Sequence, residues 1–281
     1  MSNPISRTIL TFQHNAKLYT FTTSVLAVAP FASLAEANRQ LFKTATDDDS
    51  VVVTKETIFH PQGGGQPSDV GTMCSSNPSP GDTAFNVSAV RMDAVNDGQV
   101  LHLGRFADAA QRFTPGETVT QAVDVNTRLL YSRLHTAGHV LGAAVRHLLE
   151  AQIPGFDELK ASHFPDSAAC EFRGLIDGKH KESIQAKVDA YVTRAMPVEI
   201  DWWTEDDFRA NGLERLIPSP ENGGFGVRLP AGEKYRVVKI VGAEVHPCGG
   251  THVESTDLCG KVGVRKISRN RGTSRVSYSL S

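Results

Sequence analysis

Cysteine and long apolar runs are both scarce in this chain, and each shortage excludes a class of protein. The 281 residues include four cysteines, which are too few and too scattered for a disulfide scaffold. No apolar run approaches the roughly 20 residues that a membrane-spanning helix needs. The apolar stretch at residues 24–34 begins too late for a signal peptide and contains Pro30. We therefore expect a cytoplasmic protein with no membrane segment.

The chain also lacks an excess of either positive or negative charge. The chain has 29 Lys and Arg against 31 Asp and Glu, a net charge of −2, so overall charge gives no reason to expect nucleic acid as a partner. The C-terminal segment, residues 258–281, differs because it has no acidic residue. It is either a solvated face of a terminal hairpin or a surface for phosphate groups. Its basic residues are Lys261, Arg265, Lys266, Arg269, Arg271 and Arg275.

Short runs rich in Val, Thr and Phe recur through the first 125 or so residues, with turn residues between them. This pattern predicts a small β-barrel. A helix over residues 33–44 is expected to interrupt the strands, because Ser33 can cap it three residues before Glu36. The runs expected to form strands are residues 18–28, 50–54, 84–92, 99–103 and 118–123.

The pattern becomes helical after Asp124. Apolar residues recur at helical spacing over residues 126–150, where Asn126 is a suitable cap. A second helix is expected over residues 181–195, followed by strands within residues 233–241 and 260–280. We therefore predict an α+β protein. Its small N-terminal β-barrel domain, residues 1–124, carries a glycine-rich loop and precedes an α+β domain, residues 125–281.

Two short motifs supply metal-binding side chains. His135 and His139 are four residues apart within the expected long helix, so both imidazoles lie on one face. Cys248 and His252 flank Gly249-Gly250-Thr251, whose glycines let the backbone bend so that thiolate and imidazole converge. Three imidazoles and one thiolate suit tetrahedral Zn²⁺. We expect one Zn²⁺ per chain, bound by these four residues.

The role of such a zinc ion is left open by the sequence. A His-Glu-x-x-His motif would indicate a zincin protease with the Glu as base, but Thr136 occupies that position. Four protein ligands are typical of structural zinc, whereas catalytic zinc keeps one position open. One ligand could be displaced, the ion could become five-coordinate, or it could hold the substrate instead of activating water. The catalytic residue, including any general base, is unknown.

In combination, several segments resemble the free-standing alanyl-tRNA editing proteins (AlaX type, medium-length class), which are similar to the editing domain of alanyl-tRNA synthetase. The resemblance runs from about residue 51 to the C-terminus, with the segments in the family's order. The segments are a glycine-rich motif at residues 57–69, the first zinc motif at residues 123–139, a further segment at residues 160–172, the second zinc motif at residues 248–253 and the closing strands at residues 261–280.

This resemblance implies a fold, a cofactor and a reaction. The fold would be a β-barrel domain followed by a zinc-containing α+β editing domain. The activity would be hydrolysis of mischarged Ser-tRNA(Ala) to free amino acid and tRNA. Whether Gly-tRNA(Ala) is a second substrate is left open by the sequence. Such an enzyme is needed because a binding pocket distinguishes these amino acids from alanine by only ~1–3 kcal/mol. The partner would be mischarged alanine tRNA, with no obligate protein partner.

Further residues are candidates for contacts with the substrate, and each has a structural alternative. The glycines could form a tight turn, the threonines could make local hydrogen bonds, and the arginines could be solvated. Candidates for substrate or tRNA binding are Gly63, Gly64, Gly65, Arg269 and Arg271. Weaker candidates for the catalytic site are Thr136, Thr251, His163 and Gln66.

Two other functions fit the same residues. One is a zinc-stabilised RNA-binding module without catalysis, its four ligands closed around a structural metal. The other is an editing enzyme for a different mischarged tRNA. Assays with a panel of mischarged tRNAs distinguish all three functions.

Overall fold

The computed structural model describes residues 7–76, 83–108, 110–218 and 233–281. The chain forms two compact units, one of residues 1–63 and 67–128 and the other of residues 64–66 and 129–281. From the sequence, we expect the whole glycine-rich loop in the first domain, whereas residues 64–66 belong to the second unit of the structure. The expected boundary between residues 124 and 125 stays a prediction.

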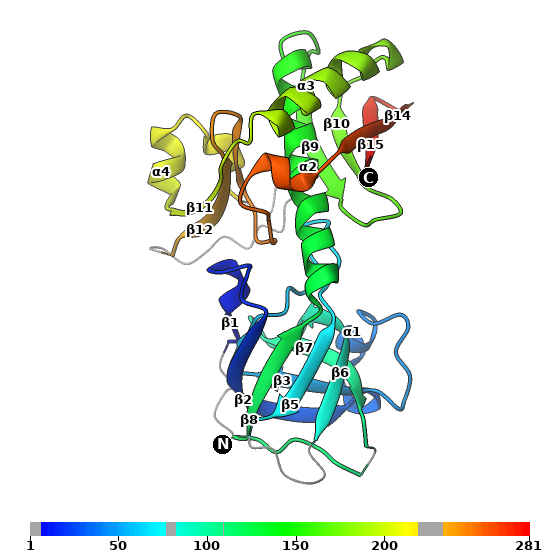
Figure 1. Cartoon of the computed structure of the whole chain (residues 1–281), viewed down its shortest axis with the longest axis vertical. Helices are drawn as coiled ribbons and strands as arrows, with labels where there is room; N and C mark the ends of the chain where they lie inside the picture. Colours follow the sequence, from blue (N-terminus) through cyan, green and yellow to red (C-terminus); the bar gives the residue numbers. More distant parts are fainter. Residues whose placement is uncertain (1–6, 77–82, 109, 219–232) are drawn as a thin grey trace. The chain divides into compact units, whose positions relative to one another are not determined.

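The first unit contains a closed β-barrel, which confirms the barrel predicted from the sequence (Figure 1). Its strands are connected in the order β2-β3-β7-β6-β5-β8, and β8 pairs with β2 to close the ring. A short parallel pair, β1 (Ile9–Leu10) and β4 (Glu56–Thr57), lies outside the ring. The barrel strands are β2 (Thr20–Pro30), β3 (Ser50–Thr54), β5 (Gly71–Ser75), β6 (Ala84–Met92), β7 (Val100–Phe106) and β8 (Thr118–Val123).

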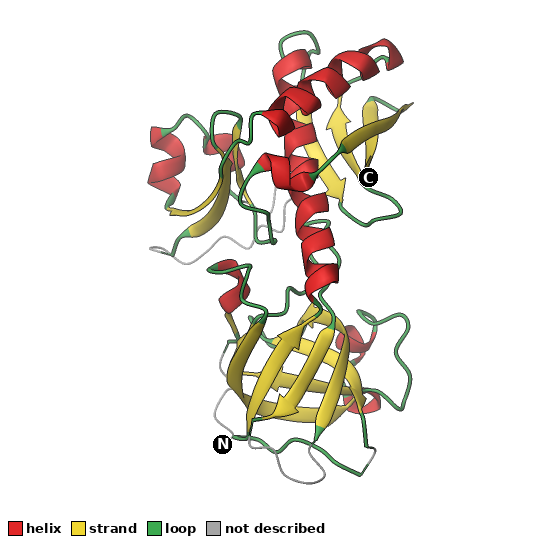
Figure 2. Cartoon of the chain, viewed as in Figure 1, coloured by secondary structure: helices red, strands yellow, loops and turns green. Residues whose placement is uncertain are grey.

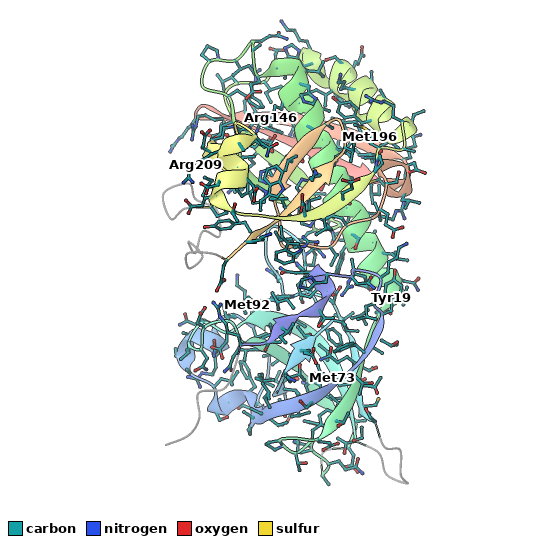
Figure 3. All side chains as sticks on the ribbon, turned by 90° about the vertical axis from the view of Figure 1, so that its left-hand side faces the viewer. Tyr19, Met73, Met92, Arg146, Met196 and Arg209 are labelled. Carbon is teal, nitrogen blue, oxygen red and sulfur yellow. The ribbon has the colours of Figure 1, made fainter. Side chains whose placement is uncertain are left out.

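Strand β3 shows how the barrel acquires a core on both faces. Val52 packs in the cluster that includes Phe59 and Met73, whereas its neighbours Val51 and Val53 pack in a second cluster with Phe31 and Phe42. This alternation is the period of two that a strand imposes on its side chains. Met73 is fully buried, whereas Met92, at the end of β6, is 39% exposed (Figure 3).

Two details of the predicted helices are wrong. The expected helix over residues 33–44 is reduced to α1 (Glu36–Arg39), because Ser33 donates its hydroxyl hydrogen bond backwards to the Pro30 carbonyl and caps nothing. At the long helix, Asp124 and not Asn126 accepts the hydrogen bond from the backbone N–H of Thr127, at 2.7 Å. This is the capping geometry that a helix start requires.

The second unit contains two sheets and helices (Figure 2), which confirms the predicted mixture of helices and strands. One sheet has the order β14-β15-β10-β9, and the other has the order β11-β12-β13. The strands are β9 (Asp157–Ser162), β10 (Ala169–Arg173), β11 (Val198–Trp203), β12 (Tyr235–Ile240), β13 (Glu244–Pro247), β14 (Val262–Asn270) and β15 (Thr273–Leu280). The helices are α2 (Val125–Leu149), which begins in the first unit, α3 (Lys181–Thr193) and α4 (Glu205–Ala210).

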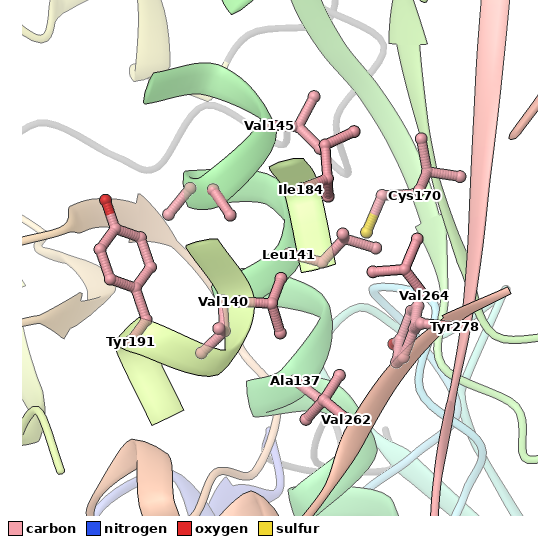
Figure 4. Packing of buried hydrophobic residues seen from close by; sticks show 14 of the residues in the cluster. Ala137, Val140, Leu141, Val145, Cys170, Ile184, Tyr191, Val262, Val264 and Tyr278 are labelled. Atoms are coloured by element: carbon pink, nitrogen blue, oxygen red, sulfur yellow. The ribbon is translucent and has the colours of Figure 1, made fainter. Parts of the chain in front are cut away.

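Helix α2 supplies the centre of this unit's core. Val140, Leu141 and Val145 are fully buried and pack in one cluster with residues of α3, β10, β14 and β15 (Figure 4). Gly138 and Gly142 lie on the same helix without side chains of their own. The helix is therefore held by apolar packing on several sides, which gives the histidines it carries a rigid support.

None of the helices within the described residues is both long and apolar enough to cross a membrane.

Candidate metal centre

The four predicted ligands lie together. The ligand atoms of His135, His139, Cys248 and His252 are all within 4.8 Å of one another. The Cys248 Sγ lies 3.4 Å from the His135 Nε2 and 3.3 Å from the His252 Nε2. A tetrahedral zinc ion with bonds of ~2.3 Å to sulfur and ~2.0 Å to nitrogen would separate these atoms by roughly 3.5 Å. The two Cys248 distances and the donor set therefore fit zinc.

Each histidine of the cluster is oriented by a partner at its Nδ1. The His135 Nδ1 lies 2.7 Å from the Gln66 Oε1, the His139 Nδ1 lies 2.6 Å from the Glu244 Oε1, and the His252 Nδ1 lies 3.1 Å from the Thr136 Oγ1. When Nδ1 donates a proton to such an acceptor, Nε2 keeps the lone pair that binds a metal. All three imidazoles are thus set to present Nε2 to one point.

The loop that carries Cys248 is shaped by close packing. A Cβ atom at Gly250 would lie 2.3 Å from the His135 Cε1 and 2.7 Å from the Gln66 Oε1. The chain bends at Gly250, as predicted from the sequence, although neither Gly249 nor Gly250 has a positive φ. Gly250 also provides space for the ligand ring. The Arg236 guanidinium also donates to the Cys248 carbonyl and fixes this loop.

Charge around the sulfur favours the form of cysteine that binds metals. Burial raises the pKa of the Cys248 thiol, but the hydrogen bond with His139 and the positive charges of His139 and Arg236 lower that pKa below its ordinary value. Burial lowers the pKa of His139, but its bonds with Cys248 and Glu244 outweigh burial and raise that pKa to about 10. The thiolate is the nucleophile and metal ligand, so the surroundings prepare Cys248 for coordination. These pKa values describe the chain without metal, in which His139 is protonated; a zinc ion would displace the proton from its Nε2.

His246 is not in the described group of ligands. Its ring makes an edge contact with His139, at 5.7 Å between ring centroids, and burial lowers its pKa to about 4. A neutral imidazole beside a ligand adds no charge to the site.

Gln66, Thr251 and Thr136 are fully buried around the ligands. The Gln66 Oε1 also accepts from the Thr251 backbone N–H at 3.0 Å, while its Nε2 donates to the Thr251 Oγ1 at 2.8 Å. Thr251 also shares a 2.7 Å hydrogen bond with Ser132, and Thr136 accepts from the Val253 backbone N–H. Gln66 and Thr136 therefore contact ligand imidazoles directly, and Thr251 holds Gln66. A catalytic role stays a prediction for all three.

His163 lies against this cluster from another direction. Its ring stacks on that of His135, with 4.2 Å between centroids, and its Nδ1 lies 2.7 Å from the Tyr278 hydroxyl. Burial and the charge of His139 lower its pKa to about 3. Its backbone N–H donates to the Gly65 carbonyl at 2.8 Å, which connects it to the glycine-rich segment.

The three glycines of that segment differ. A Cβ atom at Gly65 would lie 2.4 Å from the Ala161 carbonyl oxygen, and both Gly64 and Gly65 have a positive φ. Gly63 would tolerate a Cβ atom, since its nearest neighbour lies at 3.8 Å. Close approach to β9 therefore requires glycine at position 65, while a role in substrate binding stays a prediction for all three.

The basic residues of the β14–β15 hairpin are mostly exposed, but their partners differ. Arg269 forms an ion pair with Asp177 at 3.5 Å, and Arg275 forms one with Glu171 at 3.1 Å. Within the described parts of the chain, Lys266 and Arg271 have no ion-pair partner. Arg271 sits at the hairpin turn with φ of 45°. Lys266 and Arg271 are therefore the most available to a phosphate.

Sequence reasoning missed Glu244, Arg236 and Ser132, which hold ligands or residues next to ligands. Their contacts join positions between 12 and 119 apart in the chain. The position of Glu244, four residues before Cys248, is the sequence signal that could have identified it, because a ligating histidine usually donates to a carboxylate or carbonyl.

Known proteins resemble this chain over the segment that carries two of the four ligands. Residues 235–277, which include Cys248 and His252, match the family described as threonyl and alanyl tRNA synthetase second additional domain. The chain is 28% identical over 98% of its length to alanine–tRNA ligase of Methanosphaera stadtmanae and 30% identical over 82% to that of Methanosarcina acetivorans. It is 29% identical over 84% of its length to alanyl-tRNA editing protein AlaX-L of Pyrococcus horikoshii.

These matches span only part of each relative, namely 27% and 23% of the two ligases and 52% of AlaX-L. They nevertheless confirm the resemblance that the sequence motifs indicate. The chain is related to the AlaX-type alanyl-tRNA editing proteins and to the corresponding region of alanine–tRNA ligases.

Proposed function

We propose that this protein is a zinc-dependent aminoacyl-tRNA deacylase that hydrolyses Ser-tRNA(Ala) to serine and tRNA in the cytoplasm. The observation that carries the proposal is the convergence of three imidazoles and the Cys248 sulfur on a single point. The Nδ1 of each imidazole is hydrogen bonded to a side chain outside the cluster. The relatives named as alanyl-tRNA editing protein and alanine–tRNA ligase support alanine tRNA as the partner.

A zinc ion held by His135, His139, Cys248 and His252 would supply Lewis-acid chemistry at the ester or at water. The chain's own residues prepare the site for this. Gln66, Glu244 and Thr136 orient the imidazoles, and the charge of Arg236 favours the thiolate of Cys248. An aminoacyl ester is already an activated acyl group, so no additional protein nucleophile is required.

Partial exposure of two ligands favours catalysis over a purely structural metal. His139 and Cys248 are only partly buried, whereas His135 and His252 are buried. A structural zinc site is closed by its four ligands, whereas a catalytic site must admit the substrate. Under the proposal, an aminoacyl ester would reach the metal from the side of these two ligands.

A panel of aminoacyl-tRNAs tests the proposal. Purified protein with one zinc per chain should release serine from Ser-tRNA(Ala) much faster than alanine from Ala-tRNA(Ala), and the panel should include Gly-tRNA(Ala). Ser-tRNA(Ser) and Thr-tRNA(Thr) serve as controls for the tRNA. Hydrolysis of a different mischarged tRNA would identify another editing specificity, and binding of tRNA without any hydrolysis would indicate a zinc-stabilised RNA-binding module.

A further inference from the structure

His163 is a buried polar side chain whose ring is held on several sides. It is 3% exposed, it stacks on the ligand His135, and its Nδ1 faces the Tyr278 hydroxyl. That hydroxyl donates its own proton to the Leu134 carbonyl, at 2.9 Å. Because the Tyr278 proton is engaged there, the Tyr278 oxygen must accept from the His163 Nδ1–H. The neutral ring therefore has its lone pair at Nε2.

Among the described residues, that Nε2 atom has no hydrogen-bond partner. It is not sealed either, because Thr11 Oγ1 is the only completely buried side-chain nitrogen or oxygen without a partner among the described residues. An oriented acceptor next to a metal ligand, with access to solvent, is available to a hydrogen-bond donor on a bound molecule.

Two glycines make room for this ring. A Cβ atom at Gly138 would lie 2.3 Å from the His163 Cε1 and 2.8 Å from the Tyr278 hydroxyl. A Cβ atom at Gly65 would lie 3.2 Å from the His163 Cδ2. Gly138 lies between the two ligands of α2, so the space for His163 is built into the metal-binding motif itself.

The other candidates for reading a hydroxyl are already engaged. The hydroxyls of Thr136 and Thr251 are fully buried and hydrogen bonded around the ligands, and both ends of the Gln66 amide are used. Of the candidates from the sequence, His163 alone keeps an acceptor without a described partner.

We propose that His163 is the residue that distinguishes serine from alanine, its Nε2 accepting a hydrogen bond from the serine hydroxyl of the aminoacyl ester. This inference rests on the proposed function and adds its specificity determinant. Alanine has no hydroxyl to donate, so its ester would leave Nε2 without a hydrogen bond in a desolvated site. A site built to hydrogen-bond a substrate hydroxyl strongly rejects an analogue that lacks that hydroxyl.

A matched pair of variants separates the two ring nitrogens. His163→Asn keeps an N–H near the position of Nδ1, for Tyr278, but has no atom at the position of Nε2. His163→Gln can place its carbonyl oxygen near the position of Nε2 and loses the Nδ1 donor. Single-turnover kcat/KM is measured for Ser-tRNA(Ala) and Ala-tRNA(Ala), which differ only in the hydroxyl, together with zinc content and Tm.

The Asn variant should lose about tenfold or more in kcat/KM for Ser-tRNA(Ala), the size of one hydrogen bond, and change the slow rate on Ala-tRNA(Ala) far less. The Gln variant should recover part of the preference for serine at one zinc per chain. Parallel losses on both substrates, or an unchanged preference in the Asn variant, would overturn the inference. If the Asn variant loses its zinc, the Gln variant becomes the test. A Gln variant that does not keep both one zinc per chain and a preference for Ser-tRNA(Ala) would also overturn the inference.

Gly138→Ala provides an independent route to the same outcome. Alanine favours a helix by about 1 kcal/mol over glycine, yet its Cβ would displace the His163 ring. Preference for serine should fall while the helix remains folded, and an unchanged preference would contradict the inference. Absence of hydrolysis by the wild-type protein on every mischarged tRNA(Ala) would instead refute the proposed function, before any variant is compared.

Discussion

The two units of this chain each contain a buried polar cluster, and the clusters differ in where their polar atoms point. In the barrel unit, the Arg128 guanidinium is satisfied by the Asp69 carboxylate and by the carbonyls of Ala16 and Ile58. Asp69 also accepts from the His60 backbone N–H. Both charged side chains are 1% exposed. This cluster is complete without any ligand.

The metal centre has the opposite arrangement. Its outer nitrogens are satisfied by Gln66, Glu244 and Thr136, while its inner atoms converge on one another. Three imidazole nitrogens and one thiolate sulfur whose lone pairs face one another are costly to bury, unless a bound cation interacts with those lone pairs. Burial of polar groups alone therefore does not indicate a ligand site, because the barrel cluster is equally buried and satisfied within the chain, whereas the metal centre has ligand atoms that face one another.

Breaking the metal centre should have the largest effect on activity. Cys248→Ala removes the thiolate, so zinc content should fall well below one per chain and deacylation of Ser-tRNA(Ala) should be abolished. Cys259→Ala is the control, because Cys259 is a buried cysteine that is not in the ligand group. Elemental analysis and the deacylation assay measure both. Normal activity in the Cys248 variant would contradict the assigned ligand set.

Breaking the barrel cluster should affect stability without affecting the metal. Asp69→Asn leaves the Arg128 charge buried with no counter-charge, which should destabilise the barrel unit by about 3–5 kcal/mol. Urea unfolding followed by circular dichroism measures the loss. Asp97→Asn is the control, since Asp97 forms an exposed ion pair with Arg7 and such pairs contribute little. If Asp69→Asn unfolds like the wild type, the cluster is not a stability element.

Removing a side chain that holds a ligand imidazole should have an intermediate effect, on metal affinity. Gln66→Leu removes the acceptor for the His135 Nδ1 and for the Thr251 N–H, and loss of such a partner typically lowers metal affinity by about 10- to 100-fold. Gln66→Glu keeps an acceptor oxygen and should lose less. Competition with a chromogenic chelator gives the affinities. Equal affinities in all three proteins would remove Gln66 from the metal centre.

Removing positive charges from the hairpin of β14 and β15 should have the smallest effect, on tRNA binding. Changing Lys266 and Arg271 together to Ala should weaken tRNA binding and reduce the slope of log affinity against log salt by about 1 to 2. Arg269→Ala should change the slope less, because Arg269 is paired with Asp177. Fluorescence titrations at several salt concentrations measure the slopes. If the double variant keeps the wild-type slope, the hairpin is only a solvated face.

The same difference between the clusters explains what could be predicted from the sequence. The ligands His135 and His139 follow from helical spacing, and Cys248 and His252 lie only four residues apart, so short-range pattern identifies them. Their supports do not follow, because Gln66 reaches His135 across 69 positions and Glu244 reaches His139 across 105.

Local patterns also failed where tertiary contacts decide. Ser33 bonds backwards to Pro30 and so does not start the expected helix. Strand β5 (Gly71–Ser75) was not expected, since its short mixed sequence shows no clear alternation and its pairing with β6 and β8 defines it. The barrel itself was predictable because its longer strands carry the β-rich pattern.

Metal dependence of deacylation tests the central claim most directly. The protein is stripped of metal with a chelator, and hydrolysis of Ser-tRNA(Ala) is measured as zinc is added back in substoichiometric steps. We predict that activity is absent without metal, rises linearly with zinc and reaches its plateau at one zinc per chain. Full activity in protein shown by elemental analysis to contain no metal would contradict the account.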